Sequence, residues 1–330
     1  MDGSADDLAG ALALELADAL GPVDVEDLQR LTAGANRETW RFDAHCDGVV
    51  HPLIVQLDRA GLADGGSAHD ARILAVAAGH GACVPEVVVA GDGATAVGRS
   101  FLVTRRLDGE TIPRRLLRDE RWTAARATFV DDCAAALAKI HAIPIDVPEL
   151  AGVPRVADPL APLREMYDPL DDPHPAFELG LRWLDLHRPA PLRPAVVHGD
   201  FRLGNLLLDE RGLAAVLDWE LAMIGDPTAD LGWLCVRAWR FGAPGRVAGI
   251  GAAEDLLSAY NARAGTTIDV DALRWWELWG TVRWGIMCLF MGGGFRRGLT
   301  SSIELAMVGR RVVENAADVV DLLRELEADR

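Results

Sequence analysis

Hydrophobic and polar positions in the first hundred residues alternate in short runs, and two segments have helical periodicity. Leucines at every fourth position from Leu8 to Leu20 predict an amphipathic helix, which ends at Gly21 and Pro22. Residues 68–78 have the apolar spacing of a second helix. Runs typical of strands occupy positions 28–31, 39–42, 53–57, 86–90 and 101–104. We therefore expect a small antiparallel sheet with one inserted helix in residues 1–106.

Beyond residue 107 the spacing of apolar positions becomes mostly helical. A long helix is expected over residues 121–141, because Pro144 stops its register. Residues 151–175 are rich in proline and aspartate, so we expect an irregular segment there. Further helices are expected at residues 177–187, 229–240, 253–264, 270–291 and 299–326. The predicted fold class is α+β, with a larger helical domain spanning residues 107–330.

Short apolar runs within this helical region surround a polar motif. Residues 195–197 predict a strand that leads into His-Gly-Asp-Phe-Arg-Leu-Gly-Asn at positions 198–205. Residues 206–208 and 214–217 predict a hairpin, and Asp218 follows its second strand. The chain thus offers two carboxylates and one amide, each beside a short buried strand.

Asp200, Asn205 and Asp218 form a set that suits magnesium-dependent phosphoryl transfer. Such a reaction needs one acid that orients a hydroxyl and takes its proton, and an amide and a second acid that hold the metal. Hard cations prefer these oxygen ligands. Each residue alone is common in turns and helix caps. The three together, in two strand-loop units, favour the chemical interpretation.

Three further polar residues can support the loop. His198 could be catalytic, but Asp200 already fills the role of base, so we expect the histidine to bond the loop backbone. Asp226 and Asp230 begin the next helix, where either can cap free N–H groups. Bracing the catalytic loop is the alternative role for these two acids.

Composition narrows the class of protein. Half of the 330 residues are hydrophobic and the formal net charge is -17, with no basic stripe, which argues against nucleic-acid binding. The five cysteines include no closely spaced pair, so we expect buried thiols in a reducing compartment, the cytoplasm.

The acidic N-terminus lacks the basic start of a signal peptide. Glu277 and Arg283 interrupt the tryptophan-rich stretch 275–291, which favours a core helix over a membrane span.

The polar motifs resemble a known family. Residues 198–205, 217–220 and 225–231 resemble the Brenner-type motifs of the aminoglycoside phosphotransferase family, and the resemblance extends over nearly the whole chain. It implies a two-lobed protein-kinase-like fold that uses ATP and Mg²⁺. It also implies that Asp200 is the catalytic base and that Asn205 and Asp218 bind magnesium. The expected partner is a small-molecule alcohol.

The resemblance also assigns a nucleotide site to the first domain. Residues 31–42 resemble the hairpin that covers the nucleotide, although an ordinary hairpin is an equal alternative from the residues alone. Residues 102–107 resemble the interlobe hinge, whose backbone would meet adenine. The residues assigned to the nucleotide are Gly34, Ala35, Asn36, Arg37, Gln56, Asp70, Thr104, Arg105 and Arg106.

Two of these residues depart from the family pattern. Gln56 stands where the family carries a phosphate-gripping Lys or Arg, and Asp70 stands where its helical partner is usually Glu. Either Arg59, Arg41 or Arg37 substitutes for the missing cation, or the grip on the nucleotide is weak. The second case would make the chain a nucleotide-binding pseudokinase.

The sequence leaves two kinds of alcohol as candidates for the acceptor of the phosphoryl group. The family includes kinases for aminoglycosides and macrolides, while residues 301–312 resemble the branch associated with acyl-CoA dehydrogenases, whose proposed substrates are hydroxyacyl thioesters. The acidic net charge could attract a cationic substrate or serve solubility alone. A protein kinase is disfavoured because Gly199 stands where those enzymes carry Arg and because no Ala-Pro-Glu segment follows Asp218.

Overall fold

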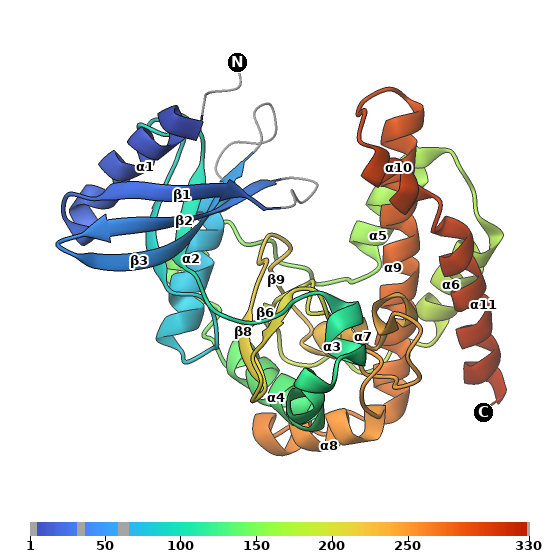
Figure 1. The fold of residues 1–330 in the computed structure, drawn as a ribbon. Helices are drawn as coiled ribbons and strands as arrows, with labels where there is room; N and C mark the ends of the chain where they lie inside the picture. Colours follow the sequence, from blue (N-terminus) through green and yellow to red (C-terminus); the bar gives the residue numbers. More distant parts are fainter. Residues whose placement is uncertain (1–4, 32–36, 59–65, 329–330) are drawn as a thin grey trace. The chain divides into compact units, whose positions relative to one another are not determined.

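A computed structural model describes residues 5–31, 37–58 and 66–328 (Figure 1). The chain forms two compact units. The first comprises residues 1–109, 147–151 and 214–220, and the second comprises residues 110–146, 152–213 and 221–330. Asp218 therefore belongs to the first unit, although the chain around it is mostly in the second. The division into a nucleotide lobe ending at residue 106 and a catalytic lobe stays a prediction.

The first unit contains a five-stranded antiparallel sheet with the order β1-β2-β3-β5-β4. Its strands are β1 (Asp24–Arg30), β2 (Arg37–Cys46), β3 (Val49–Asp58), β4 (Val87–Gly91) and β5 (Phe101–Arg105). Asp47 and Gly48 both have positive φ angles, 49° and 76°, as a two-residue hairpin turn requires. This turn sets the register in which Arg37 lies opposite Asp58.

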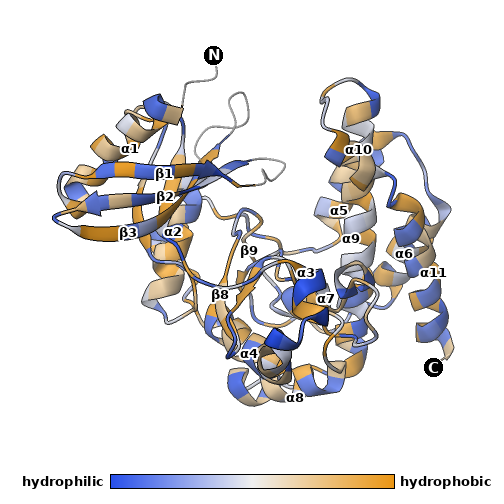
Figure 2. Ribbon diagram, viewed as in Figure 1, coloured by the Kyte–Doolittle hydropathy of each residue, from blue (hydrophilic) through white to orange (hydrophobic). Residues whose placement is uncertain are grey.

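The two faces of this sheet have different environments. Phe42, Leu53 and Val55 pack into an apolar core with Leu12 and Leu16 of helix α1 (Ala5–Leu20). Figure 2 shows hydrophobic and hydrophilic residues mixed along the strands, because side chains alternate between the two faces. The polar positions of β2 and β3 face away from that core, and helix α2 (Gly66–Gly79) packs against β3, β4 and β5.

The second unit is built mainly of helices around one long central helix. Their bounds are α3 (Pro113–Arg118), α4 (Thr123–His141), α5 (Ala161–Tyr167), α6 (Pro175–Leu186), α7 (Thr228–Cys235), α8 (Ala253–Ala264), α9 (Val270–Arg296), α10 (Ile303–Gly309) and α11 (Val312–Ala328). Helix α9 packs against α6, α7, α10 and α11 (Figure 1). Trp275, Trp276 and Trp279 lie in this core, as expected for aromatic residues at helical spacing.

Three expectations about the helices are wrong. The helix expected over residues 229–240 ends at Cys235, and a separate turn of 3-10 helix follows at Arg237–Arg240. Residues 151–175 are not wholly irregular, because Leu163 and Tyr167 of α5 bury themselves against α9 in spite of the surrounding prolines. Residues 299–326 form two helices, with the break after Gly309. A Cβ at Gly309 would approach the Cα of Gly292 to 2.4 Å, so close backbone packing against α9 shapes this region.

Short strands position the polar motif. Strand β6 (Ala195–Val197) pairs with β9 (Met223–Gly225), a strand that the sequence analysis missed. This pairing brings the start of the loop 198–205 close to the start of α7. After the loop come β7 (Leu206–Leu208), a turn closed by a hydrogen bond from the Asp209 N–H to the Gly212 carbonyl, and β8 (Leu213–Val216). The boundary between the two units falls within β8.

Four of the five cysteine side chains are buried. Among the helices of the described ranges, none combines the length and hydropathy that crossing a bilayer requires.

Candidate active site

The loop after β6 makes a turn that requires glycine. Gly199 has a φ of +79°, and a Cβ there would lie 2.1 Å from the Leu221 carbonyl oxygen. Gly204 has a φ of +114°, which is also outside the range that other residues adopt comfortably. These two glycines let the chain turn sharply between β6 and β7. Asp200 follows the first glycine and Asn205 follows the second.

Asp200 is held by three side chains. The Trp233 indole N–H donates to Oδ1 at 2.8 Å, and the Asn205 amide nitrogen donates to Oδ2 at 2.5 Å. Arg202 Nε lies 3.0 Å from Oδ1 and 3.2 Å from Oδ2. The Asp200 residue is 8% exposed. Both carboxylate oxygens are therefore held in a defined orientation, with a small part of the residue open to a reactant.

The amide of Asn205 is oriented by the same loop. Its nitrogen donates to the Asp200 side chain and also to the Asp200 backbone carbonyl at 3.1 Å. The residue is buried. An amide whose nitrogen is used in this way can present only its oxygen to a cation, and that oxygen is the type of ligand that Mg²⁺ prefers.

Asp230 at the start of α7 is fully buried and accepts bonds from the loop. Its Oδ2 accepts the His198 N–H at 2.8 Å, and its Oδ1 accepts the Gly199 N–H at 2.9 Å. His141 Nε2 lies 3.1 Å from the same carboxylate, and His141 Nδ1 lies 2.7 Å from the Tyr260 hydroxyl. Asp230 thus ties the loop to helices α4 and α8.

His198 and Asp226 both accept hydrogen bonds from backbone N–H groups. The Asp200 N–H donates to His198 Nδ1 at 3.1 Å, so the histidine ring supports the loop backbone. Asp226 accepts the Thr228 N–H at the start of α7 and the Leu192 N–H, both at 2.9 Å. Asp226 therefore caps the helix, whereas Asp230 braces the loop. The sequence allows either role for both acids, and the structure assigns a different role to each.

Arg283 of α9 reaches the loop from the far end of the sequence. Its Nη1 donates to the Gly199 carbonyl at 2.7 Å. The guanidinium lies 4.6 Å from the ring centroid of Trp233 and 5.3 Å from that of Trp279. Burial lowers the pKa of Arg283, although the negative charges of Asp200 and Asp230 oppose this shift. The arginine lies among aromatic rings and holds the backbone next to Asp200.

Sequence reasoning missed Trp233, Arg283 and Tyr260 as neighbours of the loop. A charged residue in an otherwise apolar helix is the signal that could have identified Arg283. Trp233 and Tyr260 carry no such signal, because buried tryptophans and tyrosines occur throughout ordinary cores.

Asp218 lies in the first unit, two residues after the end of β8. Its φ is +64°, in the left-handed region that residues other than glycine seldom adopt. The neighbouring Trp219 is buried, and its indole N–H donates to the Val216 carbonyl at 3.2 Å. Backbone strain of this kind persists where packing enforces it, and it is concentrated at functional sites.

The predicted nucleotide residues are described only in part. Gly34, Ala35 and Asn36 lie outside the described residues, as does Arg59. Gln56 lies opposite Thr39 in the sheet, while Asp70 forms an ion pair with Arg37 at 2.6 Å.

The predicted hinge residues take part in the sheet. Thr104 is buried in β5 and lies opposite Ile54. The Arg105 N–H donates to the Glu86 carbonyl at 2.9 Å, and the Arg106 N–H donates to the Pro52 carbonyl at 3.0 Å. Since these two N–H groups are used within the first unit, an adenine contact in this stretch would have to use other backbone groups.

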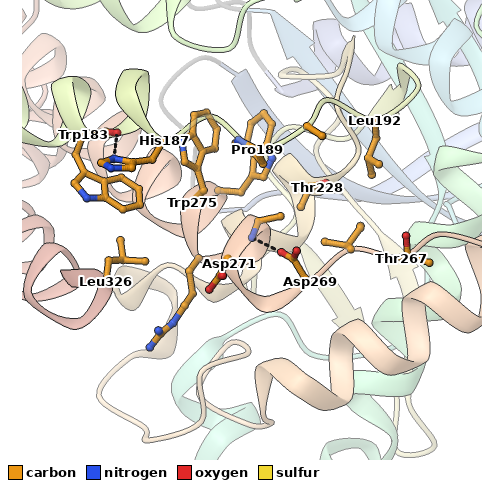
Figure 3. Close-up of a pocket in the computed structure, with 15 residues that line it drawn as sticks. Trp183, His187, Pro189, Leu192, Thr228, Thr267, Asp269, Asp271, Trp275 and Leu326 are labelled. Atoms are coloured by element: carbon orange, nitrogen blue, oxygen red, sulfur yellow. Dashed lines mark hydrogen bonds between the residues drawn. The ribbon is translucent and has the colours of Figure 1, made fainter. Parts of the chain in front are cut away.

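A pocket of about 360 Å³ lies elsewhere in the second unit (Figure 3). Its walls include Trp183, Trp275 and Leu326, and Asp269 at its rim caps α9 by accepting the Ala272 N–H. None of the predicted site residues lines this pocket. The volume of a pocket does not by itself indicate a reaction, so the loop 198–205 remains the candidate active site.

Comparisons with known proteins agree with the motifs. Residues 27–275 match the sequence pattern of the phosphotransferase enzyme family (APH). Over 64 residues the chain is 48% identical to acyl-CoA dehydrogenase family member 10 of Mus musculus, a match that covers 19% of this chain and 6% of that protein. Over 148 residues it is 31% identical to an aminoglycoside 3'-phosphotransferase of Escherichia coli, covering 42% of this chain and 53% of that enzyme. The matches thus span only part of the length of both relatives.

Solved structures are similar over almost the full chain. A Ralstonia eutropha protein assigned as an aminoglycoside phosphotransferase has a TM-score of 0.74 and 20% identity, covering 96% of this chain and 98% of that one. The aminoglycoside phosphotransferase APH(4)-Ia, in a complex with AMP-PNP and hygromycin B, has a TM-score of 0.63 and 19% identity, with the same coverage. These similarities confirm the protein-kinase-like fold that the motifs imply. The chain therefore belongs to the phosphotransferase enzyme family that includes the aminoglycoside phosphotransferases.

Proposed function

We propose that this protein transfers the γ-phosphoryl group of ATP to a hydroxyl group of a small molecule, with Asp200 as the base. The observation that carries this proposal is the set of bonds around Asp200. Trp233, Arg202 and Asn205 hold both carboxylate oxygens while the residue keeps a small exposed surface. Phosphoryl transfer depends mainly on positioning and charge stabilisation, and such a carboxylate suits both.

In this reaction Asp200 orients the acceptor hydroxyl and takes its proton as the new O–P bond forms. The bond between the γ-phosphorus and the oxygen that bridges it to the β-phosphate breaks, and ADP leaves with that oxygen. Arg202 lies beside the carboxylate, and its side chain is 26% exposed. Its positive charge can therefore offset charge that develops near Asp200.

Asn205 and Asp218 are the residues that would hold magnesium. Within residues 5–31, 37–58 and 66–328, no three His, Cys, Asp or Glu side chains are grouped to hold a metal ion. Magnesium is commonly bound by one or two protein oxygens together with substrate phosphates, and an amide with one carboxylate is such a set. When bound, the ion offsets the negative charge of the nucleotide phosphates.

The charges near Asp200 bear on the class of acceptor. Arg202 contacts its carboxylate, and Arg283 contacts the adjacent Gly199 carbonyl. A polycationic aminoglycoside would meet these two positive charges close to the reacting group. We therefore favour a neutral or anionic alcohol over a cationic one, although the chain as a whole carries a net charge of -17.

An apolar surface along α9 supports the same choice. Met287 and Phe290 follow Arg283 by four and seven residues, so the three share one face of the helix. Phe290 is 54% exposed, and Ile303 and Met307 of the adjacent α10 are more exposed still. The apolar surface thus extends from the residue that contacts the catalytic loop. A hydroxyacyl thioester, which joins an acyl chain to an anionic carrier, suits this combination best, and the 48% identical segment of the mouse acyl-CoA dehydrogenase relative agrees with it.

A panel of acceptors tests the function and the acceptor class together. With Mg-ATP, we expect ADP release and a phosphorylated product with hydroxyacyl-CoA esters, and far less with aminoglycosides, macrolides or choline. Phe290→Ser should raise the KM for the acyl ester about tenfold, since burying a large apolar side chain contributes about 1.5–3 kcal/mol. Leu179→Ser on α6 is the control, because Leu179 is also 54% exposed but lies on another helix. Preferential turnover of aminoglycosides would overturn the acceptor class and leave the reaction type intact.

A nucleotide-binding pseudokinase is the second candidate, and Gln56 is the observation that favours it. A glutamine cannot supply the positive charge that the family places on β3. Under this alternative, calorimetry would detect Mg-ATP binding, but no acceptor in the panel would yield product. Turnover of any acceptor at an ordinary kinase rate, about 1–100 per second, would exclude it.

Trp233 provides a test of how Asp200 is held. Trp233→Phe removes the N–H that donates to Asp200 Oδ1 and keeps an aromatic ring in a buried position. We expect kcat to fall about tenfold with KM for ATP unchanged, since a hydrogen bond to a charged group contributes about 1.5–3 kcal/mol. Trp284→Phe is the matched control, because its buried indole nitrogen has no hydrogen-bond partner among the described residues. Equal losses in the two variants would show that packing, not the bond to Asp200, is responsible.

A further inference from the structure

The first unit contains a positive charge, Arg37, on the strand next to the one where the family pattern expects it. Strand β3 carries Gln56 where a cation is expected, which leaves the nucleotide phosphates without a partner on that strand. If the proposed function holds, another residue has to supply this charge. The register of the sheet and the contacts of α2 identify which one it is.

Arg37 lies on the same face of the sheet as Gln56. Arg37 is opposite Asp58, and Thr39 is opposite Gln56, in the antiparallel register of β2 and β3. Residues opposite each other point to the same side, so Arg37 and Gln56 are diagonal neighbours about 7–8 Å apart. An arginine side chain is long enough to cover that separation. Its guanidinium can therefore occupy the region that a basic residue at position 56 would reach.

The contacts of Arg37 match those expected for the missing cation. Its Nη1 donates to Asp70 Oδ2 on α2 at 2.6 Å, and its Nε lies 3.4 Å from Asp58 Oδ1. The side chains of Arg37 and Asp70 are only 11% and 5% exposed. Asp58 in turn accepts the Ser67 hydroxyl at 2.6 Å, at the start of α2. Arg37 thus links β2, β3 and α2. It pairs with Asp70, which stands at the position of the helical carboxylate that the family pairs with a cation on β3.

Arg37 is also close to the acidic segment after β8. Burial alone would lower its pKa, but Asp70, Glu220 and Asp58 together raise it. Glu220 is two residues after Asp218, the predicted magnesium ligand, and both belong to the first unit. The guanidinium is therefore paired with the inserted helix, and the charge of the segment expected to carry the metal also acts on it. Because the charges of three carboxylates act on this guanidinium, a nucleotide would bind here together with its magnesium.

The other basic residues proposed for this role are less suitable. Arg41 is exposed, and it donates to Gln29 of β1 at 2.6 Å and 3.1 Å. Arg59 lies outside the described residues. We propose that Arg37, supplied from β2 and oriented by Asp70, binds the α- and β-phosphates of the nucleotide in place of the basic residue that β3 lacks.

Calorimetric titration with ADP, with and without magnesium, tests this proposal without relying on turnover. Arg37→Gln should weaken ADP binding about 10- to 100-fold, the loss expected for a charge-assisted bond to phosphate. The double variant Arg37→Gln with Gln56→Arg moves the charge to β3, where Asp70 can still orient it, and should recover most of the affinity. Arg41→Gln is the matched control on the same strand and face, and its affinity should equal that of the wild type.

A second variant separates binding from folding. Arg37→Gln leaves the buried Asp70 carboxylate without its partner, which can destabilise the unit. Arg37→Gln with Asp70→Asn replaces the ion pair by two neutral amides, so the sheet and helix should stay folded by circular dichroism while ADP binding remains weak. Wild-type affinity in folded Arg37→Gln would overturn the assignment and leave the proposed function standing. A folded charge-swap variant that binds no better than Arg37→Gln would also overturn it. A wild-type protein that binds no nucleotide would remove the proposed function and this inference together.

Discussion

Asp200→Asn is expected to lower the rate of product formation about 100- to 10,000-fold, the range that a positioned general base contributes. The amide cannot take the proton of the acceptor hydroxyl, but it keeps nearly the shape of the carboxylate and can still accept the Trp233 N–H. Nucleotide affinity should change little. Coupled measurement of ADP release, together with detection of the phosphorylated product, gives the rate, and calorimetry gives the affinity.

The control for Asp200→Asn is the same substitution at an exposed acid. Asp185 on α6 pairs with Arg188 at 2.9 Å, and its side chain is 64% exposed. Asp185→Asn removes one negative charge from the same unit and should leave the rate unchanged. If Asp200→Asn kept more than about a tenth of the wild-type rate, the assignment of Asp200 as the base would be wrong, since a general base contributes at least about 100-fold.

Asp230→Ala is expected to lower the free energy of unfolding by about 3–5 kcal/mol, because it breaks a fully buried charged network. The carboxylate is 0% exposed. Its loss leaves the N–H groups of His198 and Gly199 without their acceptor, and removes the carboxylate from His141 Nε2. The loop that carries Asp200 would no longer be held, so activity should fall as well. Urea unfolding followed by tryptophan fluorescence measures the change in stability.

Asp226→Ala is a graded control for this effect. Asp226 also accepts two backbone N–H groups, but it is only partly buried and has no histidine partner in the described part of the chain. Loss of this helix cap should cost about 1–2 kcal/mol. If the two substitutions had equal effects, the bonds from Asp230 to the loop and to His141 would not be the source of the larger loss.

The pH dependence of stability gives a second readout for Asp230. Burial by itself would raise the pKa of this carboxyl, but the hydrogen bond and charge of His141 and the His198 N–H lower it below the usual value. A lowered folded pKa means that the stabilisation is present above the unfolded value of about 3.9 and is lost as pH falls below it. Wild-type stability should therefore decrease below about pH 4 more steeply than that of Asp230→Ala.

Local periodicity was sufficient to predict most elements of this fold. Strand β6 and helix α8 have the predicted bounds, and α1, α4 and α6 differ from prediction by a few residues at their ends. These elements have regular apolar spacing and clear stop signals. Helix α5 and the break between α10 and α11 were missed, because the first depends on packing against α9 and the second on a close backbone contact between Gly292 and Gly309.

The residues of the candidate site also fall into two groups, those that the sequence predicted and those that only the structure revealed. Asp200, Asn205 and Asp218 lie in short motifs whose residue types and spacing already indicate metal-assisted phosphoryl transfer. The groups that hold Asp200 come from far along the chain. Trp233 is 33 residues from Asp200, and Arg283 is 84 residues from Gly199. His141 and Tyr260 are 119 residues apart and still act on the same carboxylate through their mutual contact.

The sequence by itself determined the phosphotransferase family and the elements that carry the candidate site residues, because both depend on residues close together in the chain. The tertiary structure decided which side chains pair. In the sequence, Asp70 stands where the family has the helical partner of a basic residue on β3, but that basic residue is absent. Three arginines could replace it. The strand register and the position of α2 brought Arg37 to Asp70, since a buried carboxylate is stable only beside a group that offsets its charge. That pairing depends on packing between distant segments, which no local pattern specifies.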